Sequence, residues 1–161
     1  MGMKLLVVSD SHHRTERLKF AFDQCKPDAV LHLGDNIIDA YELRWQVSGT
    51  VLYMVKGNCD YQDCEESELL LCIEGVKIFM SHGHGYGVKK GLNALIHAAR
   101  KKGADLALYG HTHLAQIREM PGLTLMNPGQ MERHDDLRTA SYGIVNIDSG
   151  KFACDIVYLP R

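Results

Sequence analysis

The amino-acid sequence predicts an α/β fold in which two β-sheets pack together and helices cover their outer faces. The first half of the chain alternates short apolar runs with segments of helical periodicity, an order typical of parallel sheets. The second half holds a longer series of strand-like runs separated by turn residues. Helices occur among these strands only at intervals, which favours two packed sheets with the helices outside.

The first half is expected to form a βαβαβ unit. Leu5–Val8 is a continuous apolar run, as in a strand that is buried on both faces. The other expected strands cover residues 29–33 and 50–55, and the expected helices cover residues 15–26, before Pro27, and 38–47. Strands joined by helical connections run parallel, so this part of the chain predicts a parallel sheet.

The second half is expected to contain one clear helix and most of the strands. Residues 88–102 predict that helix, because apolar residues recur at helical spacing and Gly103 follows its end. A hairpin around Glu74-Gly75-Val76 is expected from residues 69–73 and 77–80. Further strands are expected at residues 105–109, 115–119, 123–126, 141–147 and 152–158. No linker or repeat divides the sequence, so residues 1–161 are expected to form a single domain.

Composition and charge argue against several classes of function. The net charge of −2 gives no general attraction to nucleic acid or to an anionic membrane, so neither is expected as a partner. The apolar run at the start is too short for a signal peptide, and no run approaches the length of a membrane span. Five cysteines without a CxxC pair are typical of free thiols in a reducing compartment, and a cytoplasmic location is expected.

Two surface features leave alternatives open. Lys89-Lys90 and Arg100-Lys101-Lys102 are interpreted as a solvated helix face, with a nucleic-acid groove as the alternative. Tyr41, Trp45 and the β-rich C-terminal part could pack internally or against a partner, so a homo-oligomer is left open.

Polar residues of metal-binding type follow the ends of several expected strands. Ligands of open α/β sheets bind beyond the carboxyl ends of the strands, so these residues could converge on one crevice. Asp offers oxygen, neutral His offers nitrogen and Asn offers a carbonyl oxygen, which suit divalent cations. The segments, in order, are Asp10-Ser11-His12, Gly34-Asp35, Gly57-Asn58-Cys59-Asp60, Ser81-His82-Gly83-His84 and Gly110-His111-Thr112-His113.

Spacing within these segments allows more than one arrangement. Asp10 and His12 can point to the same side if the backbone there is extended. His111 and His113 can do the same, or can divide between two neighbouring ions. The alternative to a metal site is that these residues are helix caps and turn residues, a weaker hypothesis for an ordered set than for any one segment.

The ordered segments resemble the calcineurin-like metallophosphoesterase superfamily, and within it the small phosphodiesterases of the YfcE type. Asn127-Pro128-Gly129 also resembles that subgroup, and the likeness extends over nearly the whole chain. The resemblance implies a four-layer αββα sandwich with two packed mixed β-sheets and outer helices. It also implies a metal-dependent phosphodiesterase that acts on a small phosphoester substrate.

The same resemblance implies two adjoining metal sites that share Asp35. One ion would be held by Asp10, His12, Asp35 and His113, and the other by Asp35, Asn58, His82 and His111. A hydroxide bridging the ions would then be the nucleophile at neutral pH. The ligand types admit Fe²⁺, Zn²⁺, Ni²⁺ or Co²⁺, and the resemblance points first to Mn²⁺.

Asn58, Asp60 and His84 are the candidates for catalytic roles beside the ions. Asp60 would orient a neighbouring side chain, and His84 could contact phosphate or protonate the leaving group. The superfamily often has a histidine where this chain has Cys59, and a thiol is the poorer proton donor to an alcohol. The sequence therefore predicts a preference for good leaving groups and for diesters over alkyl monoesters.

Other functions and other roles for the histidines are also considered. A phosphomonoesterase or a nuclease of the same fold is one alternative, and a non-catalytic, metal-binding interaction scaffold is another. His32 lies within an apolar strand and is interpreted as a core histidine, and His97 as a helix-surface residue. His13, His134 and the turn at residues 133–136 are expected to be exposed to solvent.

Overall fold

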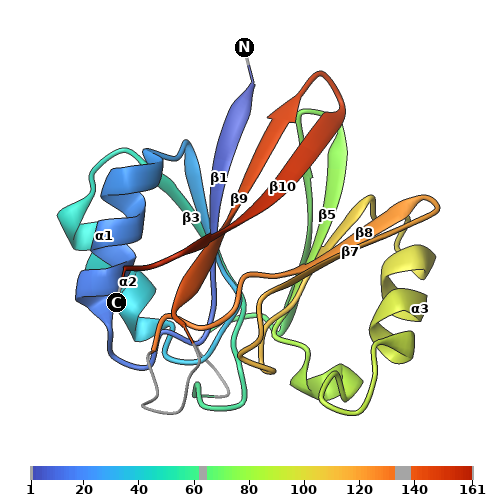
Figure 1. Cartoon of the computed structure of the whole chain (residues 1–161), viewed down its shortest axis with the longest axis horizontal. Coiled ribbons are helices and arrows are strands. Elements are labelled where there is room, and N and C mark those ends of the chain that lie inside the picture. Colours follow the sequence, from blue (N-terminus) through green and yellow to red (C-terminus); the bar gives the residue numbers. More distant parts are fainter. Residues whose placement is uncertain (1, 62–64, 133–138, 161) are drawn as a thin grey trace.

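Two five-stranded β-sheets pack face to face in the computed structural model, which describes residues 2–61, 65–132 and 139–160. Two helices cover one sheet and a third helix covers the other, so that four layers follow one another across the molecule (Figure 1). This arrangement confirms the predicted α/β sandwich with two mixed sheets and outer helices.

The first sheet has the strand order β10-β9-β1-β2-β3. Strands β1, β2 and β3 pair in parallel, whereas β9 is antiparallel to β1 and β10 is antiparallel to β9. The helices α1 and α2 make the connections between the parallel strands, as the alternating sequence predicted. The bounds are β1 Met3–Val8, α1 Thr15–Cys25, β2 Ala29–His32, α2 Ile38–Gln46, β3 Val51–Met54, β9 Ser141–Asp148 and β10 Lys151–Tyr158.

The second sheet has the order β4-β5-β6-β8-β7. Its central strands β5, β6 and β8 pair in parallel, and β4 and β7 are antiparallel edges. The bounds are β4 Glu68–Ile73, β5 Val76–Ser81, the short 3₁₀ helix η1 His84–Tyr86, α3 Asn93–Lys101, β6 Leu106–Leu108, β7 Gln116–Met120 and β8 Leu123–Asn127.

Strand alternation divides the apolar residues of β1 between two layers of core. Leu5 and Val7 of β1 face the second sheet, where they join one cluster with Ile78 of β5. Leu6 and Val8 point the other way and pack with Leu18 of α1. Successive side chains of a strand point to opposite faces, so a continuous apolar run such as β1 can be buried on both sides.

The start of the long helix differs from the prediction. α3 begins at Asn93, and residues 88–92 form a turn and a bend instead of the first part of a helix that was expected from residue 88. Gly87 and Gly91 have φ angles of +62° and +158°, which lie outside the helical region. Lys89 and Lys90 therefore do not belong to a helix face, whereas Arg100 and Lys101 do.

Two further expectations concern the hairpin and the exposed aromatic residues. β4 and β5 form the predicted hairpin, with a two-residue turn in which Glu74 and Gly75 both have positive φ. Trp45 is 90% exposed, so within this chain it does not pack internally, and the hydroxyl of Tyr41 donates a hydrogen bond to Glu65. No helix among the described residues is long and apolar enough to cross a membrane.

Candidate metal centre

The loops that follow β1, β2, β5 and β6 meet at one end of the two sheets. Backbone hydrogen bonds hold these loops together, from Asp10 N–H to the Gly34 carbonyl and from Gly110 N–H to the His82 carbonyl, each at 3.0 Å. The loop after β8 joins them, because Met131 N–H donates to the Asp10 carbonyl at 3.2 Å. Both sheets thus contribute side chains to one centre.

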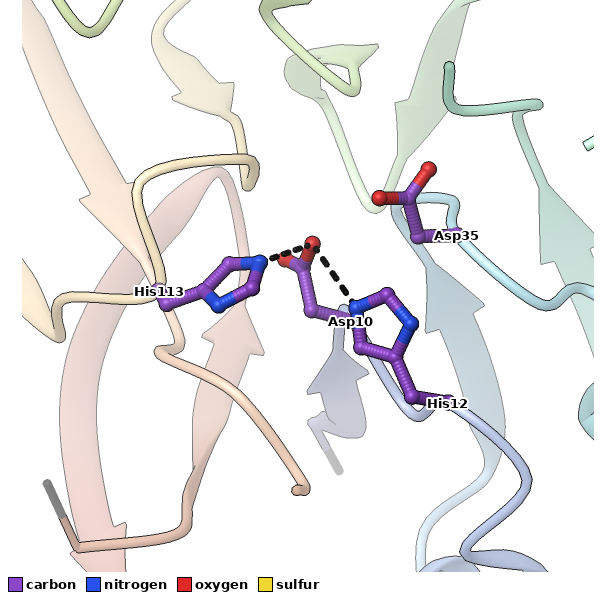
Figure 2. Close-up of side chains that lie close together, drawn as sticks. All are labelled: Asp10, His12, Asp35 and His113. Carbon is purple, nitrogen blue, oxygen red and sulfur yellow. Dashed lines mark ion pairs between the residues drawn. The ribbon is translucent and has the colours of Figure 1, made fainter. Parts of the chain in front are cut away.

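The first group of donors consists of Asp10, His12, Asp35 and His113. Each offers one ligand atom, and these atoms lie within 4.8 Å of one another (Figure 2). His113 Nε2 lies 3.1 Å and His12 Nε2 4.0 Å from Asp10 Oδ1. These four residues are the ones that the resemblance implied as ligands of one of the two ions.

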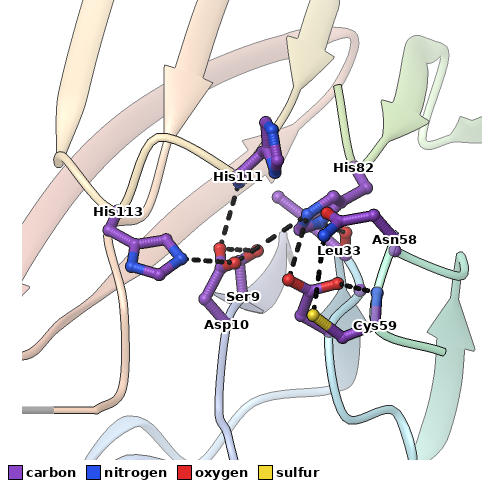
Figure 3. Close-up of polar contacts among 12 residues, drawn as sticks. Ser9, Asp10, Leu33, Asn58, Cys59, His82, His111 and His113 are labelled. Atoms are coloured by element: carbon purple, nitrogen blue, oxygen red, sulfur yellow. Dashed lines mark hydrogen bonds and ion pairs between the residues drawn. The ribbon is translucent and has the colours of Figure 1, made fainter. Parts of the chain in front are cut away.

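The second group consists of Asp35, His82 and His111, again with ligand atoms within 4.8 Å of one another. Asp35 is common to both groups, whereas His111 and His113 fall into different ones. Of the two arrangements open to these histidines, the structure has the divided one. Asn58 extends from the loop after β3 on the His82 side of the centre, and its amide donates to Cys59 Sγ at 3.5 Å (Figure 3).

The Asp10 carboxylate is anchored through one oxygen only. Asp10 Oδ2 accepts hydrogen bonds from the Ser9 hydroxyl at 2.6 Å and from His111 N–H at 3.1 Å (Figure 3). This leaves Oδ1 directed at the imidazoles of His113 and His82. Ser9 is a residue that the sequence did not single out, although it stands directly before Asp10.

His82 is fixed in one orientation by the backbone. Its Nδ1–H donates to the Leu33 carbonyl at 2.8 Å, which leaves Nε2 for the centre. Nε2 then lies 3.4 Å from Asp35 Oδ2 and 3.9 Å from Asp10 Oδ1. A carbonyl that binds the second nitrogen of a ligand histidine is a common arrangement in metal sites.

Asp60 holds backbone groups instead of a neighbouring side chain. Its Oδ2 accepts hydrogen bonds from Asp35 N–H at 2.8 Å and Gly57 N–H at 2.7 Å, and its Oδ1 accepts one from Ile37 N–H at 2.9 Å. The orienting role expected for Asp60 is therefore exerted on the loop that carries Asp35. A carboxylate with three N–H donors can fix the shape of that loop.

Several residues of the centre have left-handed backbone conformations. The φ angles of Asp10, His12, Asp35, His111 and His113 lie between +43° and +69°. The hypothesis of an extended Asp10-Ser11-His12 segment is therefore wrong. Left-handed conformations turn the chain sharply and cost non-glycine residues free energy, and such outliers concentrate at functional sites.

Buried donor atoms without hydrogen bonds indicate that this group of residues fits a metal ion. Asp10 Oδ1, His12 Nε2 and His82 Nε2 are buried and make no hydrogen bond. Such atoms are costly unless a ligand satisfies them, at about 1–3 kcal/mol each. Oxygen and nitrogen donors that converge without hydrogen bonds suit divalent cations of the first transition series.

Neighbouring imidazoles stabilise the two aspartates in their ionised form. Burial acts to raise the pKa of Asp35, but the adjacent imidazole of His82 outweighs this effect and holds the pKa below its usual range. Burial is also opposed at Asp10, where His113 and His82 lower the pKa. The pKa of His82 is raised, because the two carboxylates outweigh the effect of its own burial.

The remaining groups near the second set of donors favour their neutral forms. Burial, followed by the charge of His82, lowers the pKa of His111 to about 4 and also lowers the pKa of His84. The ring of His84 lies 5.4 Å from that of His82 and 6.0 Å from that of His111, so His84 borders the centre. Burial and the charge of Asp35 raise the pKa of the Cys59 thiol to about 11.

The other histidines lie largely where the sequence predicted. His32 is buried, its Nδ1 accepts from Gly34 N–H at 3.1 Å, and its Nε2 lies 3.0 Å from Ser11 Oγ. It is thus a core histidine with partners on both nitrogens, and it supports the loops of Asp10 and Asp35. His13 and His97 are exposed, whereas His134 and the turn at residues 133–136 lie outside the described residues.

Comparisons with known proteins point to one family. Residues 3–150 match the calcineurin-like phosphoesterase superfamily domain. The chain is 33% identical over 150 residues to the probable metallophosphoesterase YsnB of Bacillus subtilis, covering 91% of this chain and 86% of that protein. It is 29% identical over 174 residues to the phosphodiesterase YfcE of Escherichia coli, covering 91% and 89% of the two chains.

A solved structure shows the same fold. A predicted phosphoesterase from Streptococcus pneumoniae superimposes with a TM-score of 0.82 at 27% identity, covering 98% of this chain and 90% of the other. The match over residues 3–150 includes every segment that contributes to the centre. The chain therefore belongs to the calcineurin-like phosphoesterase superfamily.

Proposed function

We propose that this protein is a metal-dependent phosphodiesterase with a dinuclear centre. The observation that carries the proposal is the pair of donor groups that share Asp35, together with their buried atoms that lack hydrogen bonds. The proposed ligands are Asp10, His12, Asp35 and His113 for one ion and Asp35, Asn58, His82 and His111 for the other. Two divalent cations held there would supply Lewis acidity and a nucleophile at neutral pH.

Residues of the chain would position the ligand atoms and offset part of the metal charge. Asp35 directs Oδ2 toward His82 while its Oδ1 accepts Cys59 N–H at 2.9 Å, so the carboxylate is held in place between the two groups. Asp10 presents its unanchored oxygen in the same direction. Only two carboxylates offset the charge of two dications, which leaves a positive centre for an anionic ester.

The proposed preference for diesters with good leaving groups rests on Cys59. Its thiol, with a pKa of about 11, stays protonated at neutral pH but is too weak an acid to assist an alkoxide efficiently. Aryl leaving groups need little assistance, because their oxyanions are stable. His84 is the nearest spare imidazole and is proposed to contact phosphate or the leaving group.

The proposal also covers the metal, the cellular location and the partner. Mn²⁺ is the expected metal, because carboxylate, imidazole and amide ligands together suit it and the resemblance points to it. Cys25, Cys59, Cys72 and Cys154 are free thiols, which favours a cytoplasmic location. The proposed partner is a small phosphoester, and a homo-oligomer would have the exposed Trp45 available for its interface.

A substrate screen across metals tests the proposal. Purified protein is loaded with Mn²⁺, Fe²⁺, Co²⁺, Ni²⁺ or Zn²⁺ and assayed with bis-p-nitrophenyl phosphate, p-nitrophenyl phosphate, an alkyl monoester and an oligonucleotide. We expect the aryl diester to have the highest kcat/KM. Faster turnover of the alkyl monoester would favour a phosphomonoesterase, and a preference for oligonucleotides would favour a nuclease. A folded, metal-loaded protein without any turnover would favour the interaction scaffold.

A further inference from the structure

A cavity of about 720 Å³ opens beside the centre, between the turn that precedes α3 and the loop that follows β6. His111 and His113 form part of its wall, so the cavity and the donor groups are continuous. A volume of this size is in the range of small-molecule sites and far exceeds one phosphate group. The remaining lining residues are Val88, Lys89, Leu92, Tyr109, Thr112, Leu114, Ala115 and Gln116.

The lining of this cavity combines an apolar surface with a single lysine. Val88, Leu92 and Leu114 supply aliphatic surface, and Leu114 is 55% exposed although it is a large apolar residue. Exposed leucine at the wall of a cavity can be covered by a flat apolar group of a ligand. The cavity can thus hold the body of an ester substituent while the phosphate lies at the centre.

Lys89 is the one ammonium group among the described residues that line the cavity, and no carboxylate lines it. No ion pair joins Lys89 to any described residue, whereas Lys19 and Lys102 have such partners. An unpaired cation at an otherwise uncharged wall is suited to an anion.

We propose that this cavity binds a phosphodiester substituent that carries its own anionic group, which pairs with Lys89. The substrate class is then a diester with one apolar, nucleoside-sized substituent that ends in a phosphate or a carboxylate. This inference rests on the proposed phosphodiesterase function and adds the part of the substrate that the metal centre does not recognise. A simple diester carries one negative charge. A second anionic group would therefore let Lys89 distinguish the proposed substrate from simple diesters.

A matched pair of substrates tests the inference. Thymidine 5′-(p-nitrophenyl phosphate) and its 3′-phosphorylated counterpart release the same leaving group and differ only in the additional anion. We expect the wild type to prefer the 3′-phosphorylated ester by about fivefold in kcat/KM, the size expected of one solvent-accessible ion pair. High salt should reduce this preference.

Substitutions assign the preference to Lys89. Lys89→Ala should bring the ratio of the two kcat/KM values close to one, and Lys89→Arg should retain most of it. Lys90→Ala is the control, because Lys90 is the exposed neighbour and does not line the cavity. Equal use of the two esters by the wild type, or an equal loss for both esters in Lys89→Ala, would overturn the inference.

A binding measurement separates this inference from the proposed function. Calorimetric titration of the Mn²⁺-loaded protein compares thymidine 3′,5′-bisphosphate with thymidine 5′-monophosphate, in the wild type and in Lys89→Ala. Tighter binding of the bisphosphate that depends on Lys89 supports the cavity as an anion site. If that binding persists while bis-p-nitrophenyl phosphate is not hydrolysed, the proposed function fails and the cavity assignment stands. If bis-p-nitrophenyl phosphate is hydrolysed but Lys89 has no effect on binding, the cavity assignment fails and the proposed function stands.

Discussion

Asp35 belongs to both donor groups because the chain fixes its carboxylate from two sides. Cys59 N–H binds one oxygen, and the second oxygen faces His82. Its own backbone N–H is held by Asp60, in a left-handed conformation that only a well-supported loop retains. At the scale of single residues, the two donor groups thus depend on neighbours outside them, the Cys59 backbone and the Asp60 side chain.

Asp60→Asn should weaken metal binding more than it slows the metal-saturated enzyme. The amide can no longer accept all three backbone N–H groups, so the Asp35 loop loses support. Loss of such a supporting residue typically costs about 10–100-fold in metal affinity. Mn²⁺ titration followed by turnover measures the two effects separately.

Asp105→Asn is the matched control, because Asp105 also accepts a backbone hydrogen bond, from Lys77 N–H at 2.9 Å, in a different loop. An equal effect of the two substitutions on Mn²⁺ affinity would count against the positioning role of Asp60.

Because of His32, the free energy of unfolding of the metal-free protein should fall in mild acid. Burial, which is the main cause, lowers the pKa of His32 from 6.5 to about 4 in the folded state. The unfolded chain therefore takes up the proton first, and this contribution to stability is lost as the pH falls from 6.5 toward 4. The full loss is about 3 kcal/mol.

Denaturant unfolding of the chelated protein at pH 7.0, 6.0 and 5.0 measures this loss. His32→Gln should be less stable at neutral pH but lose less on acidification, and His97→Gln should follow the wild type. Parallel curves for the wild type and His32→Gln would show that His32 is not the source of the acid sensitivity.

At the scale of elements, the strands and two of the helices were predictable to within about two residues, because alternation and helical spacing reflect burial directly. The start of α3 was not predictable. Leu92 continues the apolar helical spacing, but the backbone at Gly91 has a non-helical conformation. The strand-end loops were recognised by their residue types. The left-handed backbone conformations of these loops could not be recognised from the sequence. Tertiary hydrogen bonds impose them, and aspartate and histidine rarely adopt such φ angles alone.

Gly57→Ala should disrupt the loop that carries the centre while leaving the sheets intact. A Cβ atom at Gly57 would lie 2.1 Å from Asp35 Oδ1 and 2.6 Å from Asp35 N. The carboxylate must then move out of both donor groups, and we expect the metal content to fall and turnover to be lost. Metal analysis by mass spectrometry and circular dichroism report these two properties.

Gly85→Ala is the corresponding control, because a Cβ atom there meets nothing within 4 Å and Gly85 has no positive φ. Loss of metal from Gly85→Ala to the same extent as from Gly57→Ala would indicate a general sensitivity of these loops instead of a specific collision.

At the scale of the whole molecule, both sheets are needed, because the loops of one sheet alone do not supply all the donor residues. Asp10 and Asp35 follow strands of the first sheet, whereas His82, His111 and His113 follow strands of the second. The order of the segments and their resemblance to a superfamily were enough to predict which residues converge. The sequence could not show the cavity beside Lys89, which depends on how residues 88–92 turn and where the loop after β6 lies.

We propose that two ions sharing Asp35 make this protein a phosphodiesterase. The most direct measurement is the hydrolysis of bis-p-nitrophenyl phosphate as chelated protein is titrated with Mn²⁺, with bound metal determined at each point. We expect activity to rise with the second ion per chain, and Asp35→Asn to lose both the second ion and turnover. Full activity with one ion, near-normal turnover by Asp35→Asn, or two bound ions without turnover would contradict the claim.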